Sequence, residues 1–309
     1  MKVKHILGAL LVVLFSYLSI KHSFTIASRE AEAVEEKAPQ QAFNLLSRIG
    51  GASGELKLNQ PSYAVSDNQG RVYISDSGNQ RIVVTDPKGR LITAIGTKDS
   101  LRPLVYPYGI VVMGNRLIVA DSGRGSVEEY NTDGEHLKTW ISPQENFRPG
   151  MLALNKDGMV IAGDLQGKQL LIFSRGGQLL SKLRPGKLAL GVPHGLAATK
   201  EGSIWVADGE NSSIKLLDSG GETISVLDSM AGLATPKGLA LDSSGRMYIS
   251  DVLSNSVWVL DKSGKELGRL QESRNEQFTL PLGISVDKSD RILVADQGGN
   301  NIQIWGQRR

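Results

Sequence analysis

Six aspartates recur through the chain at a nearly constant interval. Carboxylates in a regular array could bind calcium or act as general acids and bases. A residue that recurs in every copy of a repeat, however, is expected to have the same structural role in each copy. We therefore expect these side chains to cap turns by accepting backbone N–H bonds, and we expect chemistry where the copies differ. The six are Asp76, Asp121, Asp164, Asp208, Asp251 and Asp296, with spacings of 45, 43, 44, 43 and 45 residues.

The elements around each aspartate are short strands. Each aspartate closes a segment rich in β-branched and aromatic residues, such as Val72-Tyr-Ile-Ser-Asp76. A small apolar strand and a turn precede this segment, and a third aliphatic strand, a glycine turn and a more polar outer strand follow it. A proline opens each unit, 14 or 15 residues before the aspartate: Pro61, Pro107, Pro149, Pro193, Pro236 and Pro281.

A repeat of about 44 residues made only of strands and turns is typical of β-propeller blades. We therefore predict an all-β, six-bladed β-propeller over residues 43–309. The sixth unit ends at Trp305, before an outer strand, whereas residues 43–50 resemble the outer strand at 91–96. We expect this N-terminal strand to close the last blade and so to remove an exposed sheet edge.

The repeat resembles a known family. The segment Asp76-Ser-Gly-Asn-Gln-Arg-Ile82 and the Pro-x-Gly starts at Pro107, Pro193, Pro236 and Pro281 are similar to those of NHL-repeat propellers. The units that begin at Pro61 and Pro149 lack the glycine. This resemblance implies the fold and says little about chemistry, because propellers serve as enzymes, receptors and adaptors alike.

The first forty residues differ from the repeat. Lys2 and Lys4 precede an uncharged run from Ile6 to Ile20, which is typical of a signal-anchor or a signal peptide. We predict a membrane helix or signal peptide in residues 1–22, a stalk in residues 23–42, and a propeller on the periplasmic or extracellular side of the cell membrane. Cleavage of the leader would leave the propeller secreted or periplasmic.

Composition excludes several functions. The chain of 309 residues contains no cysteine, which excludes disulfides, thiol catalysis and thiolate metal sites. Its 35 basic residues are nearly matched by 32 acidic residues, which gives a net charge of +3. We therefore expect no nucleic-acid partner.

The copies differ most at the residue that follows each proline, which should lie at the channel mouth. Tyr108, His194 and Lys237 are the aromatic and titratable residues among these positions, and adjoining connections add Tyr106 and Arg148. They predict a mildly cationic, aromatic mouth for a protein or a small anionic ligand, although solvated loop charge would explain the same residues. The six positions are Ser62, Tyr108, Gly150, His194, Lys237 and Leu282.

His194 lies in Val192-Pro-His-Gly-Leu-Ala197, which resembles the histidine motif of zinc-dependent peptidyl-hydroxyglycine lyases. This resemblance implies a metal-dependent lyase or lactonase-type enzyme as an alternative function. Of the other histidines, His5 and His22 flank the apolar run and His136 is expected on an outer turn, so His194 would stand alone. We expect a non-enzymatic binding scaffold with no catalytic residue, metal or cofactor, and a structural subunit of a membrane complex is a further alternative.

Overall fold

The computed structural model describes residues 43–52, 54–140, 147–186, 189–228, 232–270 and 278–307. The predicted signal segment and stalk lie outside these residues. Within them, no helix has the length and apolar character needed to cross a bilayer. The one helical element of the described chain is a 3-10 turn, η1 (Ser77–Asn79).

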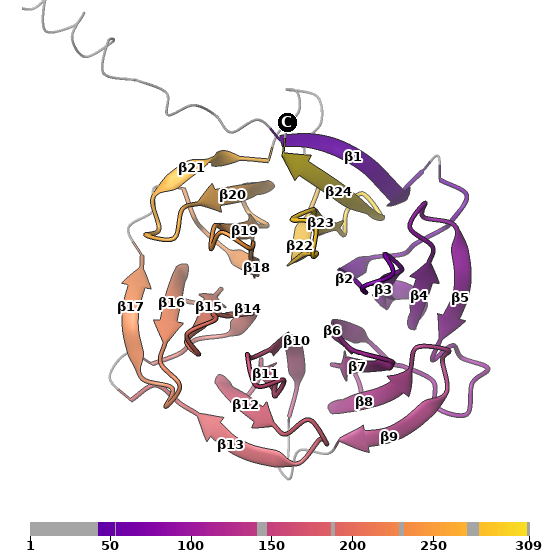
Figure 1. Ribbon diagram of the computed structural model, residues 1–309, viewed down its shortest axis with the longest axis horizontal. Coiled ribbons are helices and arrows are strands. Elements are labelled where there is room, and N and C mark those ends of the chain that lie inside the picture. The colour runs from indigo at the N-terminus through magenta and orange to yellow at the C-terminus, as the bar shows by residue number, and fades with distance from the viewer. Residues whose placement is uncertain are drawn as a thin grey trace, which may run out of the picture. The chain divides into compact units, whose positions relative to one another are not determined.

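The described chain forms six four-stranded sheets arranged in a ring, which confirms the all-β, six-bladed propeller (Figure 1). Within each blade the strands are antiparallel and follow one another from the centre outward. Blade 1 contains β2 (Pro61–Ser66), β3 (Val72–Asp76), β4 (Arg81–Thr85) and β5 (Leu91–Ile95). Blade 2 contains β6 (Pro107–Met113), β7 (Arg116–Asp121), β8 (Ser126–Asn131) and β9 (His136–Trp140). Blade 3 contains β10 (Pro149–Leu154), β11 (Val160–Asp164), β12 (Gln169–Phe173) and β13 (Leu179–Leu183).

The second half of the ring repeats this plan. Blade 4 contains β14 (Pro193–Ala198), β15 (Ile204–Asp208), β16 (Ser213–Leu217) and β17 (Thr223–Leu227). Blade 5 contains β18 (Pro236–Leu241), β19 (Met247–Asp251), β20 (Ser256–Leu260) and β21 (Glu266–Arg269). Blade 6 contains β22 (Pro281–Val286), β23 (Ile292–Asp296), β24 (Asn301–Gln307) and, as its outer strand, β1 (Phe43–Gly50).

The outer strand of blade 6 comes from the start of the propeller, as the sequence predicted. β1 pairs antiparallel with β24, in a register that runs from Phe43 opposite Gln307 to Gly50 opposite Asn301. The two ends of the ring are thereby joined by backbone hydrogen bonds, and β24 has no free edge.

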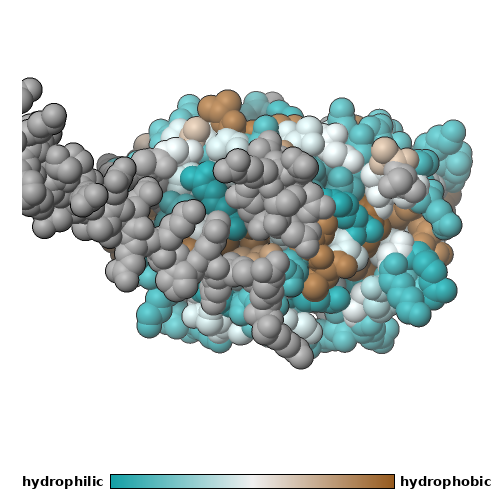
Figure 2. Space-filling view, turned by 90° about the horizontal axis from the view of Figure 1, so that it is seen from above, coloured by the Kyte–Doolittle hydropathy of each residue, from teal (hydrophilic) through white to brown (hydrophobic). Residues whose placement is uncertain are grey.

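The core lies between the blades. The second strand of every blade is buried along almost its whole length, whereas the outer strands β5, β9 and β13 are largely exposed or half-buried and end on a buried residue. In the edge-on view of Figure 2, hydrophilic residues cover much of the visible rim and hydrophobic residues appear between them in smaller groups. The apolar surface buried between blades is therefore the main stabilising contribution.

The inner strands of neighbouring blades approach each other closely at the glycine of the Pro-x-Gly start. A Cβ added at Gly109 would lie 2.5 Å from the backbone nitrogen of Leu152, and one added at Gly195 would lie 2.7 Å from that of Leu239. Glycine is required where backbones meet at this distance. Blades 1 and 3 place the buried side chains of Tyr63 and Met151 at this position instead.

Candidate functional site

The six inner strands begin on one face of the ring, which we call the proline face, and end on the opposite face, which we call the turn face. Each opening proline pairs with the ladder aspartate at the end of the second strand, as Pro193 does with Asp208. The aspartates and the residues that follow the prolines therefore share the proline face.

The six aspartates are buried, and each accepts a backbone hydrogen bond from the connection that enters its blade. Asp121 accepts from Val105 N at 3.0 Å and Tyr106 N at 2.9 Å, in the connection from blade 1, and from Arg124 N at 3.2 Å in its own turn. In blades 2 to 5 the carboxylate thus joins the incoming connection to the turn between the second and third strands, because it also accepts a backbone N–H from that turn. The corresponding donors are Asn59 N to Asp76, Arg148 N to Asp164, Gly191 N to Asp208, Thr235 N to Asp251, and Thr279 N to Asp296.

Asp208 differs from the other five in having a lysine partner. Burial alone would raise the pKa of its carboxyl group, but a 2.8 Å ion pair with Lys215, together with bonds from Gly191 N and Asn211 Nδ2, lowers the pKa overall. The negative charge of Asp208 lies close enough to His194 to raise the pKa of that histidine, which opposes the effect of the cationic groups around it.

His194 and Lys237 lie in contact at the mouth. They follow the prolines of β14 and β18, which are neighbouring inner strands, and Nζ of Lys237 is 2.7 Å from Nε2 of His194. An ammonium can only donate, so the neutral imidazole accepts at Nε2 and carries its proton on Nδ1. That Nδ1 atom is buried and has no hydrogen-bond partner among the described residues.

Burial disfavours positive charge on both side chains. Burial first, and then the charges of Lys237 and Arg148, lower the pKa of His194 to about 4, against the opposing influence of Asp208. Burial also lowers the pKa of Lys237. His194 is therefore neutral at pH 7, and the mouth holds cationic groups in a partly desolvated setting.

Tyr106 and Tyr108 form an aromatic wall on the blade 2 side of the mouth. Their rings stack with centroids 6.4 Å apart and an interplanar angle of 27°. Tyr108 is only 8% exposed, and burial raises the pKa of its hydroxyl, although Arg148 acts in the opposite direction. Tyr108 is thus a packed residue, whereas the exposed Arg148 is accessible to a ligand.

The other predicted mouth positions contribute less. The buried Ser62 donates to Pro107 O at 3.2 Å, and Leu282 is 8% exposed. In the nearby connections, Arg102 forms an ion pair with Glu128 of blade 2, and Phe278 is buried against Trp305. The accessible polar groups are therefore concentrated on Arg148, His194 and Lys237.

Further along, the channel becomes apolar toward the turn face. A space of about 240 Å³ is bounded there by residues from all six inner strands. A ligand group held at the mouth would therefore be polar on its outer side and meet an apolar channel beyond. One residue from each strand illustrates the lining: Val65, Val112, Leu154, Ala198, Leu241 and Val286.

Sequence reasoning missed a buried polar network in blade 2. Glu128 is fully buried and accepts hydrogen bonds from Ser126 Oγ and Thr139 Oγ1, both at 2.6 Å. His136 opens β9 rather than lying in the outer turn, and its Nε2 is 2.8 Å from Glu128. Burial would raise the pKa of Glu128, but these bonds lower it. The available signal was the adjacent pair Glu128 and Glu129 in a third strand, where most blades are apolar.

Comparison with known proteins identifies the repeat. A family model described as NHL repeat matches residues 190–215, within blade 4. Human NHL-repeat-containing protein 4 is 35% identical over 68 residues, covering 22% of this chain and 53% of that protein. The chain is a six-bladed propeller that contains an NHL repeat. The mouse peptidyl-glycine alpha-amidating monooxygenase is 25% identical to this propeller over 169 residues, which is 49% of this chain but only 17% of the monooxygenase.

Solved structures share the fold of this NHL-repeat propeller. Virginiamycin B lyase from Staphylococcus aureus superposes with a TM-score of 0.64 at 14% identity, covering 86% of this chain and all of the lyase chain. A Bacteroides thetaiotaomicron protein of unknown function gives a TM-score of 0.71 at 16% identity, covering 86% of this chain and 76% of the other. Likeness at these identities concerns the fold alone.

The zinc implied by the lyase resemblance does not fit the donors at the mouth. A zinc site needs three or four nitrogen, sulfur or oxygen ligands, and His194 Nε2 already faces an ammonium at 2.7 Å. Within the described ranges, no group of three or more histidine, aspartate or glutamate side chains is placed to hold a metal ion.

Proposed function

We propose that this NHL-repeat propeller is a binding protein that holds an anionic group of a protein or small ligand at its mouth. The contact between Lys237 Nζ and His194 Nε2 is the observation that supports it. These two groups, which can both carry positive charge, lie 2.7 Å apart, and the pKa of His194 and that of Lys237 are both lowered. Arg148 adds a further positive charge nearby. An anion placed here would offset the loss of solvation of these two groups and would favour their charged forms.

We also propose that the propeller is tethered outside the cytoplasm. The basic residues before the uncharged run at 6–20 support a signal-anchor in residues 1–22, with the propeller on the periplasmic or extracellular side. Tethering would raise the effective concentration of the mouth near membrane partners.

A lyase-type enzyme is the second candidate, because a quarter of the aligned residues match the amidating monooxygenases. The donor geometry around His194 makes it the weaker candidate. A structural subunit of a membrane complex is a third candidate, to be recognised by co-purification at fixed stoichiometry after mild detergent extraction.

The binding proposal is tested by titrating the full chain with inorganic phosphate and with an oligoglutamate peptide. The anions should raise the pKa of His194, followed by the NMR shifts of its ring protons. The double variant Arg148→Met and Lys237→Met should lose at least tenfold in affinity, since charged pairs of this kind contribute more than about 1.4 kcal/mol. Lys98→Met, an exposed change in a connection on the same face, is the matched control.

Equal affinity of the double variant and the wild type would refute binding at the mouth. Turnover of a peptidyl-hydroxyglycine substrate by the wild type would instead favour the enzyme.

A further inference from the structure

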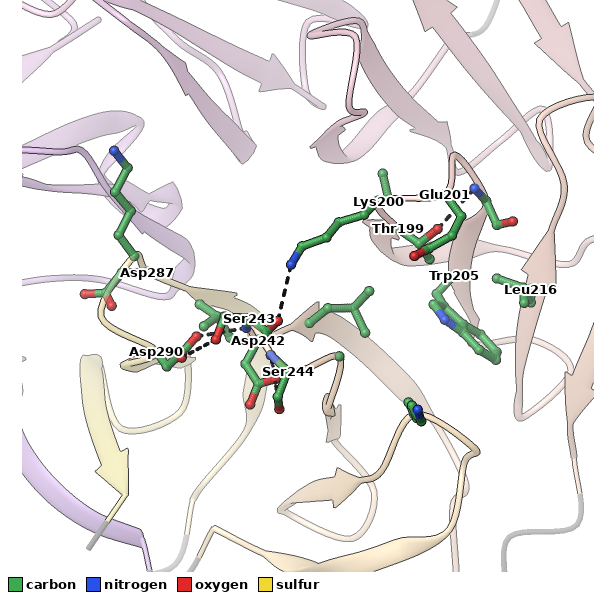
Figure 3. Close-up of a pocket in the computed structure, with 17 residues that line it drawn as sticks. Thr199, Lys200, Glu201, Trp205, Leu216, Asp242, Ser243, Ser244, Asp287 and Asp290 are labelled. Carbon is green, nitrogen blue, oxygen red and sulfur yellow. Dashed lines mark hydrogen bonds between the residues drawn. The ribbon is translucent and has the colours of Figure 1, made fainter. Parts of the chain in front are cut away.

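A second hollow lies on the turn face, at the junction of blades 4 and 5. It has a volume of about 780 Å³, within the range of small-molecule sites. Figure 3 shows Trp205 and Leu216 on one side, Asp287 and Asp290 on the other, and Lys200 reaching toward Ser243. Ala198, which lines the hollow, lies four residues after His194 of the mouth in β14, roughly 13 Å along the strand, so the two sites are distinct.

A departure from the repeat opens this hollow. In blades 1, 5 and 6 the turn after the inner strand begins with an aspartate that forms an ion pair with an arginine four residues later. Blade 4 has Thr199 and Ser203 at these two positions. The turn is kept, because Ser203 N donates to Thr199 Oγ1 at 3.2 Å, but two longer side chains are missing. The ion pairs of blades 1, 5 and 6 are Asp67–Arg71, Asp242–Arg246 and Asp287–Arg291, with N–O distances of 2.6 to 2.7 Å.

A second change enlarges the apolar part of the wall. Trp205 stands where blades 1 and 5 have Tyr73 and Tyr248, whose hydroxyls donate to the aspartates of their own turns. The indole packs in the interface between blades 4 and 5, with 9% of its surface exposed. Beside it, Ala198, Leu241 and Val286 line both this hollow and the channel, so an apolar group has a continuous surface on which to lie.

Cationic groups border this apolar surface. Lys200, Lys262 and Lys288 are exposed and line the hollow. Within the described part of the chain, no ion pair involves Lys262 or Lys288, so their charges are available to a ligand.

The acids of the same rim are already engaged. Asp242 and Asp287 pair with arginines of their own turns, and Asp290 accepts from Ser243 N at 2.9 Å and Ser243 Oγ at 2.6 Å. The carboxylate of Glu201 bonds to the Thr199 hydroxyl. Asp290 and Glu201 keep their negative charge, but neither forms an ion pair with Lys262 or Lys288 in the described part of the chain. These two ammonium groups therefore stand beside the apolar wall with no carboxylate partner in the ranges that the structure describes.

We propose that the hollow on the turn face binds a small organic anion with an apolar body, such as an aryl or alkyl carboxylate, phosphate or sulfonate. The apolar body lies against Trp205, Leu216 and the shared channel residues, and the anionic group lies near Lys262 and Lys288. This site is independent of the mouth and of the function proposed for it.

The test uses 8-anilinonaphthalene-1-sulfonate, an aromatic sulfonate, as the probe for the full chain. Calorimetry should give one equivalent bound, with a rise in probe fluorescence. The double variant Thr199→Asp and Ser203→Arg introduces the ion pair found in blades 1, 5 and 6, fills the hollow, and should reduce the affinity at least tenfold. Lys88→Met, an exposed change in another turn of the same face, should bind as the wild type does.

The exposed double variant Lys262→Glu and Lys288→Glu keeps the test decisive if the first variant fails to fold. It should also reduce the affinity at least tenfold, because it reverses two charges at the rim. Failure of the wild type to bind, or undiminished binding by a folded Thr199→Asp and Ser203→Arg variant, would overturn the proposal. The mouth variant Arg148→Met and Lys237→Met should leave probe binding unchanged, because the probe binds on the turn face. Loss of anion binding at the mouth can therefore be distinguished from loss of probe binding in the hollow.

Discussion

Acidification should destabilise the propeller through His194. Its pKa is about 4 in the folded chain, against an ordinary value of 6.5 in the unfolded chain. Between pH 6.5 and pH 4, His194 therefore binds a proton in the unfolded state but not in the folded state. The contribution of neutral His194 to the free energy of unfolding is thus fully present above pH 6.5 and is lost as the pH falls toward 4. One pKa unit corresponds to about 1.36 kcal/mol, so the full loss is about 3 kcal/mol, and between pH 7 and pH 5 it is about 2 kcal/mol.

The assay is urea denaturation of the wild type and of His194→Gln at pH 7, 6 and 5. The difference between their free energies of unfolding isolates the histidine from every other group that titrates in this range. Between pH 7 and pH 5, the free energy of unfolding of the wild type should fall by about 2 kcal/mol relative to that of His194→Gln. Lys237→Met should show a smaller shift, because it removes the charge of Lys237 and leaves the effect of burial. A difference that stays constant with pH would refute the buried contact of His194 with Lys237.

Three further outcomes are expected. Deletion of residues 43–50 should lower the melting temperature of the whole propeller and promote aggregation, seen by calorimetry and light scattering, because it exposes the edge of β24. Glu128→Gln should cost about 1.5 to 3 kcal/mol in urea denaturation, since a buried carboxylate loses charged hydrogen bonds, whereas Glu266→Gln in the exposed pair with Arg269 should cost less than about 1 kcal/mol. Tyr108→Ala should cost about 3 to 5 kcal/mol because the ring is buried, and Tyr108→Phe should be nearly neutral; a small loss for the alanine variant would contradict this packing.

The fold was largely predictable because the repeat fixes it. The regular prolines and aspartates define the register of the two inner strands, and that register places Tyr108, His194 and Lys237 on one face. Adjacent blades then bring His194 and Lys237 into contact. The register does not give the depth of a side chain, so the burial of Tyr108 was not foreseen.

The remaining features depend on contacts between blades or strands that a repeat pattern does not specify. The network of Glu128 needs the pairing of β8 with β9, in which Thr139 lies opposite Glu128. The hollow on the turn face needs the placement of three turns from blades 4, 5 and 6 around Thr199 and Ser203. Thr199 and Ser203 are not informative in the sequence by themselves. Their significance becomes visible only when they are compared with the aspartate and arginine at the same positions of blades 1, 5 and 6.

The pairing of β1 with β24 also sets the order in which the propeller can be completed. β1 is the first strand of the ring to be synthesised, and its partner is the last. The ring therefore remains open until residues 301–307 have emerged, and its final step brings together segments that are nearly a whole propeller apart in sequence. Contacts of such long range slow folding. A chain cut short before Asn301 would leave β1 without a partner and the sixth blade unfinished, whatever the quality of the five blades before it.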